Sequence, residues 1–489
     1  MLRNTRFPAY SYVAMAVFSL LSPAAGAQVA TIAQNFVGTN INQLPALNNG
    51  NSSIPPDTMG TAGINHYVET LNGSFAIYNK STGALVGSRI SLTTFWQNAG
   101  ITGLNNNPSA TGAIGTGDPR ILFDPNSQRY FVAGIDSASP NRILIAVSNT
   151  SDPTAGFKAR AINNTSSPGT FADFPMLGID QNNVYVTTNN FIPSGGGFSS
   201  NGAFIIPKSG LLQANPTIAN VTKIDNINPN TFGFANQPIV DFAGNGTSHL
   251  TLASFDSTNL HLASLDNVNT ATPSISSGNF LAVAGNTNTQ DARQPGGPNT
   301  INTGDFRFSS NVVKQGNNIW GVNTNTVAGD EVVKWYRIDA TTNLLVESGT
   351  ISTVGFDYYR PSINVTACGL VVVGYTRSGT TEFASAYASA GLFNGAATTF
   401  DAPTLLRTGA GNYNVTFGGA RNRWGDYSST TLDPTDSNSL WTIQEYASAT
   451  NVWSTNITRF QAGCPEPGAM ALFGTFALAG AGFLRRRRR

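Results

Sequence analysis

The chain has 489 residues, only 11% of them charged, and its 27 basic residues nearly balance its 26 acidic ones. Such a balance leaves no long-range field to attract DNA, RNA or an anionic membrane, so nucleic-acid binding is not expected. The 40% of hydrophobic residues suffice for one or two large cores, which excludes a disordered chain.

The N-terminus has the three parts of a secretion signal. Arg3 and Arg6 precede an apolar stretch, and Ala25 and Ala27 supply the small side chains that a signal peptidase requires. The stretch is too short to predict a membrane anchor, and a cleavage site follows it. We therefore expect residues 1–27 to be a signal peptide that is cleaved after Ala27, with export of the protein through the inner membrane.

A short phrase recurs seven times along the body, residues 28–463. In it an aspartate, often beside a proline, is followed by an apolar stretch, a turn and an aromatic-rich segment. The copies stand at residues 56–59, 117–120, 173–175, 237–240, 305–307, 359–361 and 424–427, and the fourth is degenerate. The mean spacing of about 62 residues is within reach of β-propeller blades.

Each copy is followed by further segments with the pattern of strands. After the second copy these are Arg142–Ser148 and Phe157–Ile162, and after the fifth they are Glu331–Ile338 and Leu344–Ile351. Turns rich in Asn, Gly, Ser and Pro separate them, and no long stretch has a helical period. Three or four antiparallel strands per copy predict an all-β, seven-bladed β-propeller, with six or eight blades as the nearest alternatives. A two-domain β-sandwich would not explain seven similar phrases.

The last copy predicts how the ring closes. It contains only two clear strands, Leu440–Tyr446 and Val452–Phe460, and a two-stranded blade would expose an unpaired edge. The segment Val29–Val37 is strand-like and precedes the first copy. We expect it to complete the last blade.

The two cysteines, Cys368 and Cys464, allow two interpretations. In an oxidising compartment they could form a disulfide that ties the tail to the body. Alternatively, Cys368 is a small buried residue beside a strand and Cys464 is a free thiol. We favour the second interpretation, because the sequence cannot show that the two residues are close.

The C-terminal tail, residues 464–489, has three features in order. Pro465, Glu466 and Pro467 form the first, and an uncharged, mostly apolar run over residues 468–484 forms the second. The third is a cluster of five arginines, Arg485, Arg486, Arg487, Arg488 and Arg489. About 17 apolar residues are near the lower limit for a transmembrane helix, and the arginines would hold its end on the cytoplasmic side.

This tail resembles the PEP-CTERM sorting signal of Gram-negative bacteria, from Pro465 to Arg489. The resemblance implies recognition by exosortase, a membrane transpeptidase-like enzyme, which removes the helix and leaves the body at the cell surface or outside the cell. Proteins with this signal often accompany exopolysaccharide production. The family often has an aliphatic residue where this chain has Cys464, and a plain tail anchor is the alternative.

The body resembles secreted bacterial propellers distantly related to sialidases. The similar phrases are at residues 55–60, 117–120 and 423–427. No assigned activity comes with this resemblance.

The acids of the repeated phrases predict a cluster, because in a propeller the start of each innermost strand lies at one rim of the central channel. They are Asp57, Asp118, Asp173, Asp305, Asp357 and Asp426. Carboxylates gathered around one opening repel each other unless a cation neutralises them, and calcium accepts six to eight oxygen ligands. We therefore consider calcium binding by Asp57, Asp118, Asp173 and Asp426. The alternative is that each aspartate makes turn hydrogen bonds to its own backbone.

The same rim supports a catalytic interpretation. Arginines that could clamp a substrate carboxylate are Arg120, Arg307, Arg360 and Arg423. Acids for proton transfer are Asp57, Asp118, Asp426 and Glu445. Against catalysis, the chain lacks the Ser-x-Asp-x-Gly-x-Thr-Trp box of sialidases, and arginine–aspartate bridges between blades would explain the same residues. The three histidines, His66, His249 and His261, lack zinc-binding spacing.

These observations lead to one expected function and two alternatives. We expect a non-catalytic, surface-displayed propeller that binds polysaccharide or a matrix protein, because its weakly charged surface is rich in Asn, Thr and aromatic residues. The first alternative is a secreted hydrolase or lyase that acts on acidic glycans at the Asp/Arg rim. The second is a purely architectural envelope protein.

Overall fold

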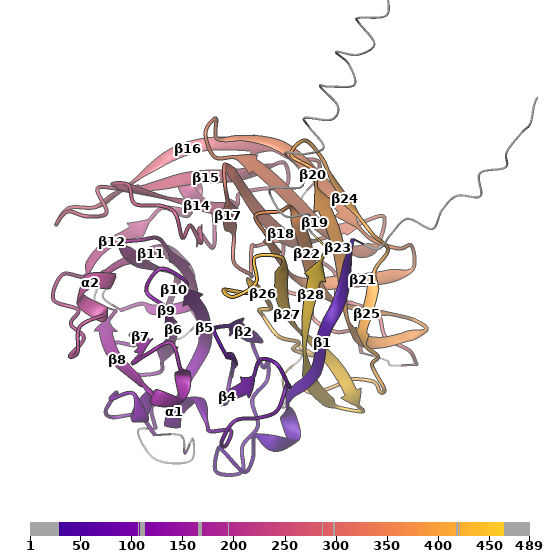
Figure 1. Ribbon diagram of the computed structural model, residues 1–489, viewed down its shortest axis with the longest axis horizontal. Helices are drawn as coiled ribbons and strands as arrows, with labels where there is room; N and C mark the ends of the chain where they lie inside the picture. The colour runs from indigo at the N-terminus through magenta and orange to yellow at the C-terminus, as the bar shows by residue number, and fades with distance from the viewer. Residues whose placement is uncertain are drawn as a thin grey trace, which may run out of the picture.

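A computed structural model describes residues 29–463 except 106, 108–112, 165–168, 194, 286, 297–298, 417–418 and 420. Seven antiparallel β-sheets stand around a common axis as the blades of a propeller (Figure 1). The predicted all-β, seven-bladed architecture is therefore confirmed. The predicted signal peptide and the predicted tail both lie outside the described residues. Within the described ranges, no helix has the length and apolar character needed to cross a membrane.

The first four blades are built in chain order. Their strands are β2 (Met59–Ala62), β3 (His66–Leu71) and β4 (Ser74–Asn79); β5 (Thr116–Asp124), β6 (Arg129–Asp136), β7 (Arg142–Ser148) and β8 (Phe157–Asn163); β9 (Phe171–Ile179), β10 (Asn183–Ile192), β11 (Gly197–Pro207) and β12 (Thr222–Ile227); and β13 (Gln237–Pro238), β14 (Ser248–Ser254), β15 (Asn259–Asp266) and β16 (Ser274–Ala282). The shortest inner strand, β13, belongs to the copy whose phrase is degenerate.

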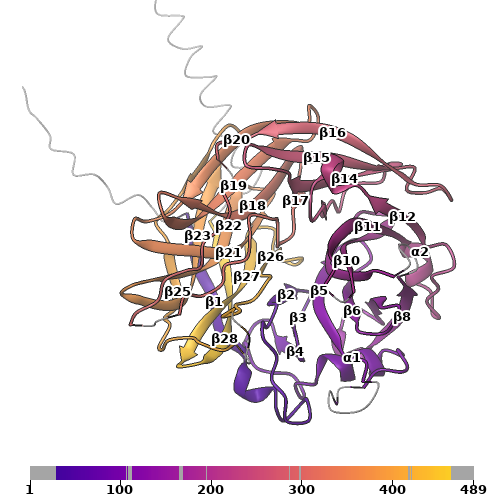
Figure 2. The ribbon, with the colours of Figure 1, turned by 180° about the vertical axis from the view of Figure 1, so that it is seen from behind.

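Three more blades complete the ring (Figure 2). Their strands are β17 (Val313–Gln315), β18 (Asn318–Val327), β19 (Asp330–Asp339) and β20 (Leu344–Ile351); β21 (Phe356–Val365), β22 (Leu370–Gly379), β23 (Glu382–Phe393), β24 (Thr398–Phe400) and β25 (Thr404–Arg407); and β26 (Ser429–Leu432), β27 (Ser439–Ala449), β28 (Val452–Ala462) and β1 (Ala30–Asn40).

The N-terminal strand β1 pairs antiparallel with β28, from Ala30 opposite Ala462 to Asn40 opposite Ser454. The last blade therefore has the order β1-β28-β27-β26, and its outermost strand comes from the other end of the chain. This confirms the predicted closure. The pairing with β1 also satisfies the backbone N–H and C=O groups that β28 would otherwise expose at the edge of the sheet.

The helices are short and fill gaps between strands. They are α1 (Leu92–Asn98), α2 (Lys208–Leu211), α3 (Pro229–Phe232) and the 3₁₀ turns η1 (Ile41–Gln43) and η2 (Pro153–Ala155). Ser91 caps the start of α1, and its side chain accepts a hydrogen bond from the backbone N–H of Thr94. Phe95 of α1 stacks on Phe75 of β4 with ring centroids 4.2 Å apart. The helix thus covers the three-stranded first blade.

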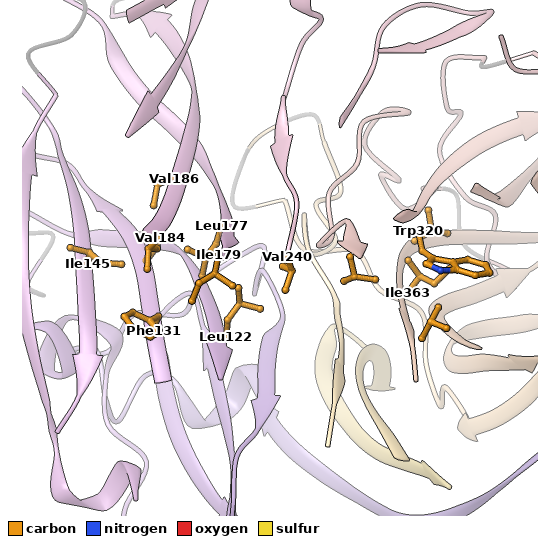
Figure 3. Close-up of a cluster of buried hydrophobic side chains, with 14 of the residues drawn as sticks. Leu122, Phe131, Ile145, Leu177, Ile179, Val184, Val186, Val240, Trp320 and Ile363 are labelled. Carbon is orange, nitrogen blue, oxygen red and sulfur yellow. The ribbon is translucent and has the colours of Figure 1, made fainter. Parts of the chain in front are cut away.

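Apolar side chains fill the wedges between blades. Figure 3 shows Leu122, Phe131 and Ile145 of the second blade near Ile179 and Val184 of the third. All five are buried, at 5% exposure or less. Burying each such side chain contributes about 1.5–3 kcal/mol, so the blades form one rigid scaffold for the residues around the axis.

The innermost strands run parallel to one another around the axis. Isolated parallel bridges join Ile179 to Val240 and Val240 to Val313, which belong to three successive blades. All inner strands therefore begin at one end of the axis and finish at the other. Because the inner edge of each blade has no further strand in its own sheet, prolines are tolerated there without the loss of a ladder hydrogen bond.

A bulge recurs where the inner strands begin. In β5, β9 and β21 the pairing register shifts around a proline. The residue before that proline has a positive φ: 52° for Asp118, 52° for Phe174 and 53° for Arg360. Asp57, directly ahead of β2, has the same φ of 52°. The bulge breaks the two-residue alternation of the strand and directs the phrase residues to the axis.

The expectation for Cys368 is wrong. Cys368 is disulfide-bonded, rather than the unpaired buried residue that we favoured. The sequence has one other cysteine, Cys464, which lies outside the described residues. The error arose because two cysteines far apart in sequence give no signal of proximity.

Candidate functional site at the polar end

The acids and arginines of the repeated phrases gather where the inner strands begin, which we call the polar end of the axis. It consists of Asp57, Asp118, Arg120, Asp173, Phe174, Asp305, Arg307, Arg360, Arg423, Asp426, Tyr427 and Glu445. Each one precedes or opens an inner strand except Glu445, which lies on β27, and the bulges of β5, β9 and β21 direct Asp118, Phe174 and Arg360 to the axis.

Asp57 and Asp118 form an interacting carboxyl pair. Asp57 is 2% exposed and accepts hydrogen bonds from the backbone N–H of Asp426 at 2.8 Å and from the Asn72 amide at 2.7 Å. Asp118 accepts one from the Tyr427 hydroxyl at 2.8 Å. Burial, followed by repulsion from Asp426, raises the pKa of Asp57 well above its ordinary value, and burial also raises the pKa of Asp118. The pair therefore retains a proton where two exposed carboxyls would both be ionised.

Asn72 joins the first two blades beneath this pair. It lies in the turn between β3 and β4, and its side-chain oxygen accepts a hydrogen bond from the backbone N–H of Asp118 at 2.9 Å. Its amide also donates to the carbonyl of Pro55 at 3.1 Å. Sequence reasoning missed Asn72, because it stands outside the repeated phrase and nothing in its neighbourhood marks it.

Asp173 is partly exposed beside the pair. Burial is the largest cause that raises the pKa of Asp173 to about 7, and repulsion from Asp118 and Asp426 adds to it. The positive charge of Arg307 acts in the opposite direction. A carboxyl with such a pKa exchanges its proton near neutral pH, which a general acid or base requires.

Arg120 lies under the carboxyl pair and is fully buried. Its Nε donates to the carbonyl of Pro175 at 2.8 Å and its Nη1 to the carbonyl of Ser309 at 2.7 Å. Its guanidinium carbon lies 3.4 Å from the centroid of the Tyr427 ring, and Tyr427 also packs edge-on against Phe174. Arg120 thus connects four blades. Its role is structural, because its guanidinium group donates to backbone carbonyls and packs on an aromatic ring of the protein itself.

Arg360 bridges the sixth and seventh blades. Its Nη2 lies 2.9 Å from Oδ1 of Asp426, which also pairs with Arg423. Nearby, Glu445 accepts a hydrogen bond from the backbone N–H of Gly425 at 2.9 Å. Burial raises the pKa of Glu445 well above its ordinary value. The sequence offered an arginine–aspartate bridge between blades as the alternative to a catalytic role for Arg360 and Asp426. The structure contains this bridge.

Besides Asp426, two more of the six predicted acids are paired with an arginine. The Nε of Arg307 donates to both carboxylate oxygens of Asp305, at 2.7 and 2.9 Å. Asp357 is held by Arg293 through two contacts of 2.8 Å. Both carboxylates are therefore neutralised by arginine, which leaves no need for a cation at these two positions.

The four predicted calcium ligands, Asp57, Asp118, Asp173 and Asp426, can be compared with what a metal requires. Among the residues that the structure describes, no three or more His, Cys, Asp or Glu side chains are arranged to hold a metal ion. Three of the four acids already accept hydrogen bonds or pair with arginine. Calcium binding stays a prediction, without a preformed ligand set.

Tyr427 is the second functional residue that sequence reasoning missed. The sequence pattern of Arg423–Tyr427 assigns a role to its aspartate and its arginine but none to its tyrosine. In the structure it joins Asp118 to Arg120 and Phe174. Burial raises its pKa well above the ordinary value, so its phenol stays protonated. The available signal was its position, one residue after the last repeated aspartate.

Comparisons with known proteins give no family assignment. No protein-family model matches the chain, and no curated protein matches it.

Solved structures are similar at low identity. A protein of unknown function from Dyadobacter fermentans is 10% identical with a TM-score of 0.37, over 71% of this chain and 94% of that one. Cobalt-substituted Synechocystis ACO, an apocarotenoid oxygenase, is 10% identical with a TM-score of 0.38, over 72% and 74%. Drosophila Semaphorin 1a, extracellular domains 1–2, is 9% identical with a TM-score of 0.39, over 83% and 85%. Similarity at this level carries no information on activity, ligand or partner.

Proposed function

We propose that this chain is an exported β-propeller, displayed at the cell surface, that binds polysaccharide at its polar end without cleaving it. Export is supported by the sequence features of residues 1–27. Sorting by an exosortase-type enzyme is supported by the Pro-Glu-Pro motif, apolar run and arginine cluster of residues 464–489. Both segments lie outside the described residues.

One observation carries the proposed binding: partly exposed charged side chains surround a buried floor at the polar end. The partly exposed residues are Asp118, Asp173, Arg307, Arg423 and Asp426, and the buried ones include Asp57, Arg120 and Tyr427. The exposed groups carry both signs of charge and are held by neighbours on rigid strands. A surface of fixed donors and acceptors loses little conformational entropy when it binds a ligand rich in hydroxyl groups.

The geometry supports binding more than cleavage, because the predicted substrate clamp is already occupied. Arg120, Arg307 and Arg360 contact carbonyls or carboxylates of the protein itself. The phenol of Tyr427 is protonated, so it offers no nucleophilic phenolate. A clamp for a substrate carboxylate would first have to break these buried contacts.

Glycan binding tests the proposal directly. The purified full chain is titrated with neutral and acidic bacterial polysaccharides, and Arg423→Ala is expected to weaken binding about fivefold to tenfold, because an exposed donor is lost. Arg129→Ala, a partly exposed arginine on β6, serves as the matched control and should leave binding unchanged. Failure to bind any polysaccharide, or equal affinities for wild type and Arg423→Ala, would contradict binding at the polar end.

A glycan hydrolase or lyase is the second candidate, and the raised pKa of Asp173 favours it. A carboxyl with a pKa of about 7 near a second protonated carboxyl has the properties of an acid–base pair. The measurement is the release of reducing ends or unsaturated products from acidic glycans. Turnover by wild type that Asp173→Asn abolishes would establish catalysis and replace the binding proposal.

Export and sorting have separate tests in a bacterium that produces an exosortase. Mass spectrometry of the mature chain is expected to find Gln28 at its N-terminus, because the predicted cleavage follows Ala27. Glu466→Ala is expected to keep the chain in the inner membrane, whereas Glu382→Ala in the body should not. Release of the Glu466→Ala chain at the wild-type rate would disprove sorting through this motif.

A further inference from the structure

A broad groove lies between the third and fourth blades, and no sequence pattern assigned it. Its cavity volume is about 990 Å³. Its walls come from the turn between β9 and β10, from parts of residues 207–222 around α2, and from the turn between β15 and β16. Because β9 begins at the polar end and finishes before its turn, the groove is on the opposite face. Helix α2 lies at the outer edge of the ring in both views (Figure 1 and Figure 2), so the groove is away from the axis.

Carboxamide side chains make up most of the polar lining, and we call this cavity the amide groove. The five amides belong to Gln181, Asn182, Asn183, Asn220 and Asn269. Hydroxyl groups of Ser209 and Thr222 stand among them. Each amide has two donor hydrogens and one acceptor oxygen, and each hydroxyl can donate and accept. The groove therefore presents donors and acceptors together, without charge.

Several of these polar groups are exposed and available. Asn220 and Ser209 are exposed, and neither side chain has a hydrogen-bond partner within the described part of the chain. Gln181 and Asn182 are exposed as well, and the amide nitrogen of each makes one long contact of 3.4 Å with a backbone carbonyl. All four residues line the same cavity, so a ligand in it reaches groups from both sides of the third blade's outer rim.

The turn that carries Gln181 and Asn182 is held in place. The Asp180 carboxylate accepts hydrogen bonds from the backbone N–H groups of Asn182 and Asn183, both at 2.7 Å. The buried amide of Asn183 donates to Oδ1 of Asn269 at 3.0 Å, which joins the third blade to the fourth. A wall fixed in this way loses little conformational entropy when a ligand binds.

The amide groove offers no free charge. Among the described residues that line it, Lys208 is the one with a charged side chain. Its Nζ lies 2.6 Å from Oδ2 of Asp124 and donates to the carbonyl of Asp180 at 2.9 Å. Lys208 is 3% exposed, so its charge is neutralised inside the protein. A charged ligand would gain no ion pair here and would lose part of its hydration, which favours an uncharged ligand.

We infer that the amide groove binds a neutral oligosaccharide chain. Neighbouring hydroxyl groups of a sugar present a donor and an acceptor side by side, which matches a carboxamide. Leu212, 41% exposed, and Val221 add hydrocarbon for the C–H faces of the sugar rings. A cavity of about 150 Å³ holds benzene, and a sugar unit is about twice that size, so the groove has room for about three units. This second glycan site goes beyond the proposed function, because it is on the other face and has different chemistry.

The first experiment measures how affinity depends on chain length. The purified full chain is titrated by calorimetry with neutral oligosaccharides of glucose, galactose, mannose and N-acetylglucosamine, from single sugars to hexamers. For the sugar that binds best, affinity is expected to rise up to about three units, which fill the groove, and to change less than about twofold beyond. A tenfold rise in salt concentration should leave it unchanged, because no ion pair forms.

Variants locate the site. Asn220→Leu is close in shape and removes an exposed, unpaired amide, so it should weaken binding about fivefold to tenfold without affecting the fold. Asn317→Leu is the matched control, because Asn317 is an exposed asparagine in the turn between β17 and β18, on the same face of the fifth blade. It should bind as wild type does. Adding Gln181→Met to Asn220→Leu should bring the loss to about thirtyfold or more.

Three results would overturn the inference: no binding of any neutral oligosaccharide, full affinity for a single sugar, and wild-type affinity in the double variant. The proposed function fails separately, because it depends on Arg423. Binding at the polar end is weakened by Arg423→Ala and not by Asn220→Leu, whereas binding in the amide groove responds in the opposite way. A neutral oligosaccharide that is sensitive to Arg423→Ala alone would support the proposed function and contradict the groove.

Discussion

The same inner strands build the polar end, where they begin, and an apolar end, where they finish, and the chemistry of the two ends is opposite. Where the strands begin, bulges and positive φ angles turn Asp118 and Arg120 into a network of charges. A few residues later the pairing is regular, and Leu122 of the same strand faces hydrocarbon. Backbone irregularity therefore accompanies the polar function, while regular pairing accompanies the apolar one. The following predictions test this contrast, from the largest expected effect to the smallest.

Arg120→Met should be the most damaging single change at the polar end. It removes a buried cation that contacts two carbonyls and the Tyr427 ring, and it leaves those carbonyls without donors. We expect the free energy of unfolding to fall by about 3–5 kcal/mol. Urea denaturation measures this change. A loss below about 1 kcal/mol would show that the network adds little to stability.

Leu122→Ala probes the apolar end two residues further along β5. It deletes buried hydrocarbon beside an existing cavity, so we expect a loss of about 2–3 kcal/mol, toward the low end for such truncations. The loss should be the same at pH 5 and pH 8, because the substitution removes neither a charge nor a hydrogen-bonding group. A pH-dependent loss would mean that the two ends are coupled.

Asp173→Asn should change how stability depends on pH. The folded pKa of Asp173, about 7, exceeds the ordinary value near 4, so the folded state binds the proton more tightly. Stability from this group is present below pH 4–5 and is lost as the pH rises to about 7. The variant should therefore be more stable than wild type at pH 8 and similar to it at about pH 4, where Asp173 is protonated in both the folded and the unfolded state. Urea denaturation at both pH values measures the free energy of unfolding. A difference between variant and wild type that is the same at both pH values would contradict the prediction.

Calcium should have the smallest effect. Asp57, Asp118 and Asp426 already have hydrogen-bond or arginine partners, so added calcium must displace them. We expect no measurable change in melting temperature between chelator and millimolar calcium. A rise that Asp118→Asn removes would instead establish the calcium site considered from the sequence.

The repeated phrase predicted most of the fold. Seven copies gave seven blades, and the predicted segments 142–148 and 344–351 coincide with β7 and β20. The strand pattern of residues 29–37 predicted the closing strand, which the structure extends to Asn40. These features depend on local periodicity and on the need to pair an edge, and both can be read along a single chain.

The candidate site was only partly predictable. The phrase correctly placed Asp57, Asp118 and Asp426 together, because each aspartate opens an inner strand. It could not show that an arginine would neutralise Asp357, since Arg293 lies outside every phrase. Nor could it indicate the cavity of about 220 Å³ at the finishing end of the inner strands, whose lining comes from six separated segments of ordinary apolar and small polar residues.

The strand order of the closing blade has a mechanical consequence. Strand β28 leads to the C-terminal tail, and it lies between β1 and β27 rather than at the edge. A pulling force applied through residue 463 therefore acts along β28, an 11-residue strand that pairs with a neighbouring strand on each side. Such a strand cannot be peeled away one bond at a time, so two rows of bonds must shear together. The strand that completes the ring also turns the end of the body into an attachment point that resists tension.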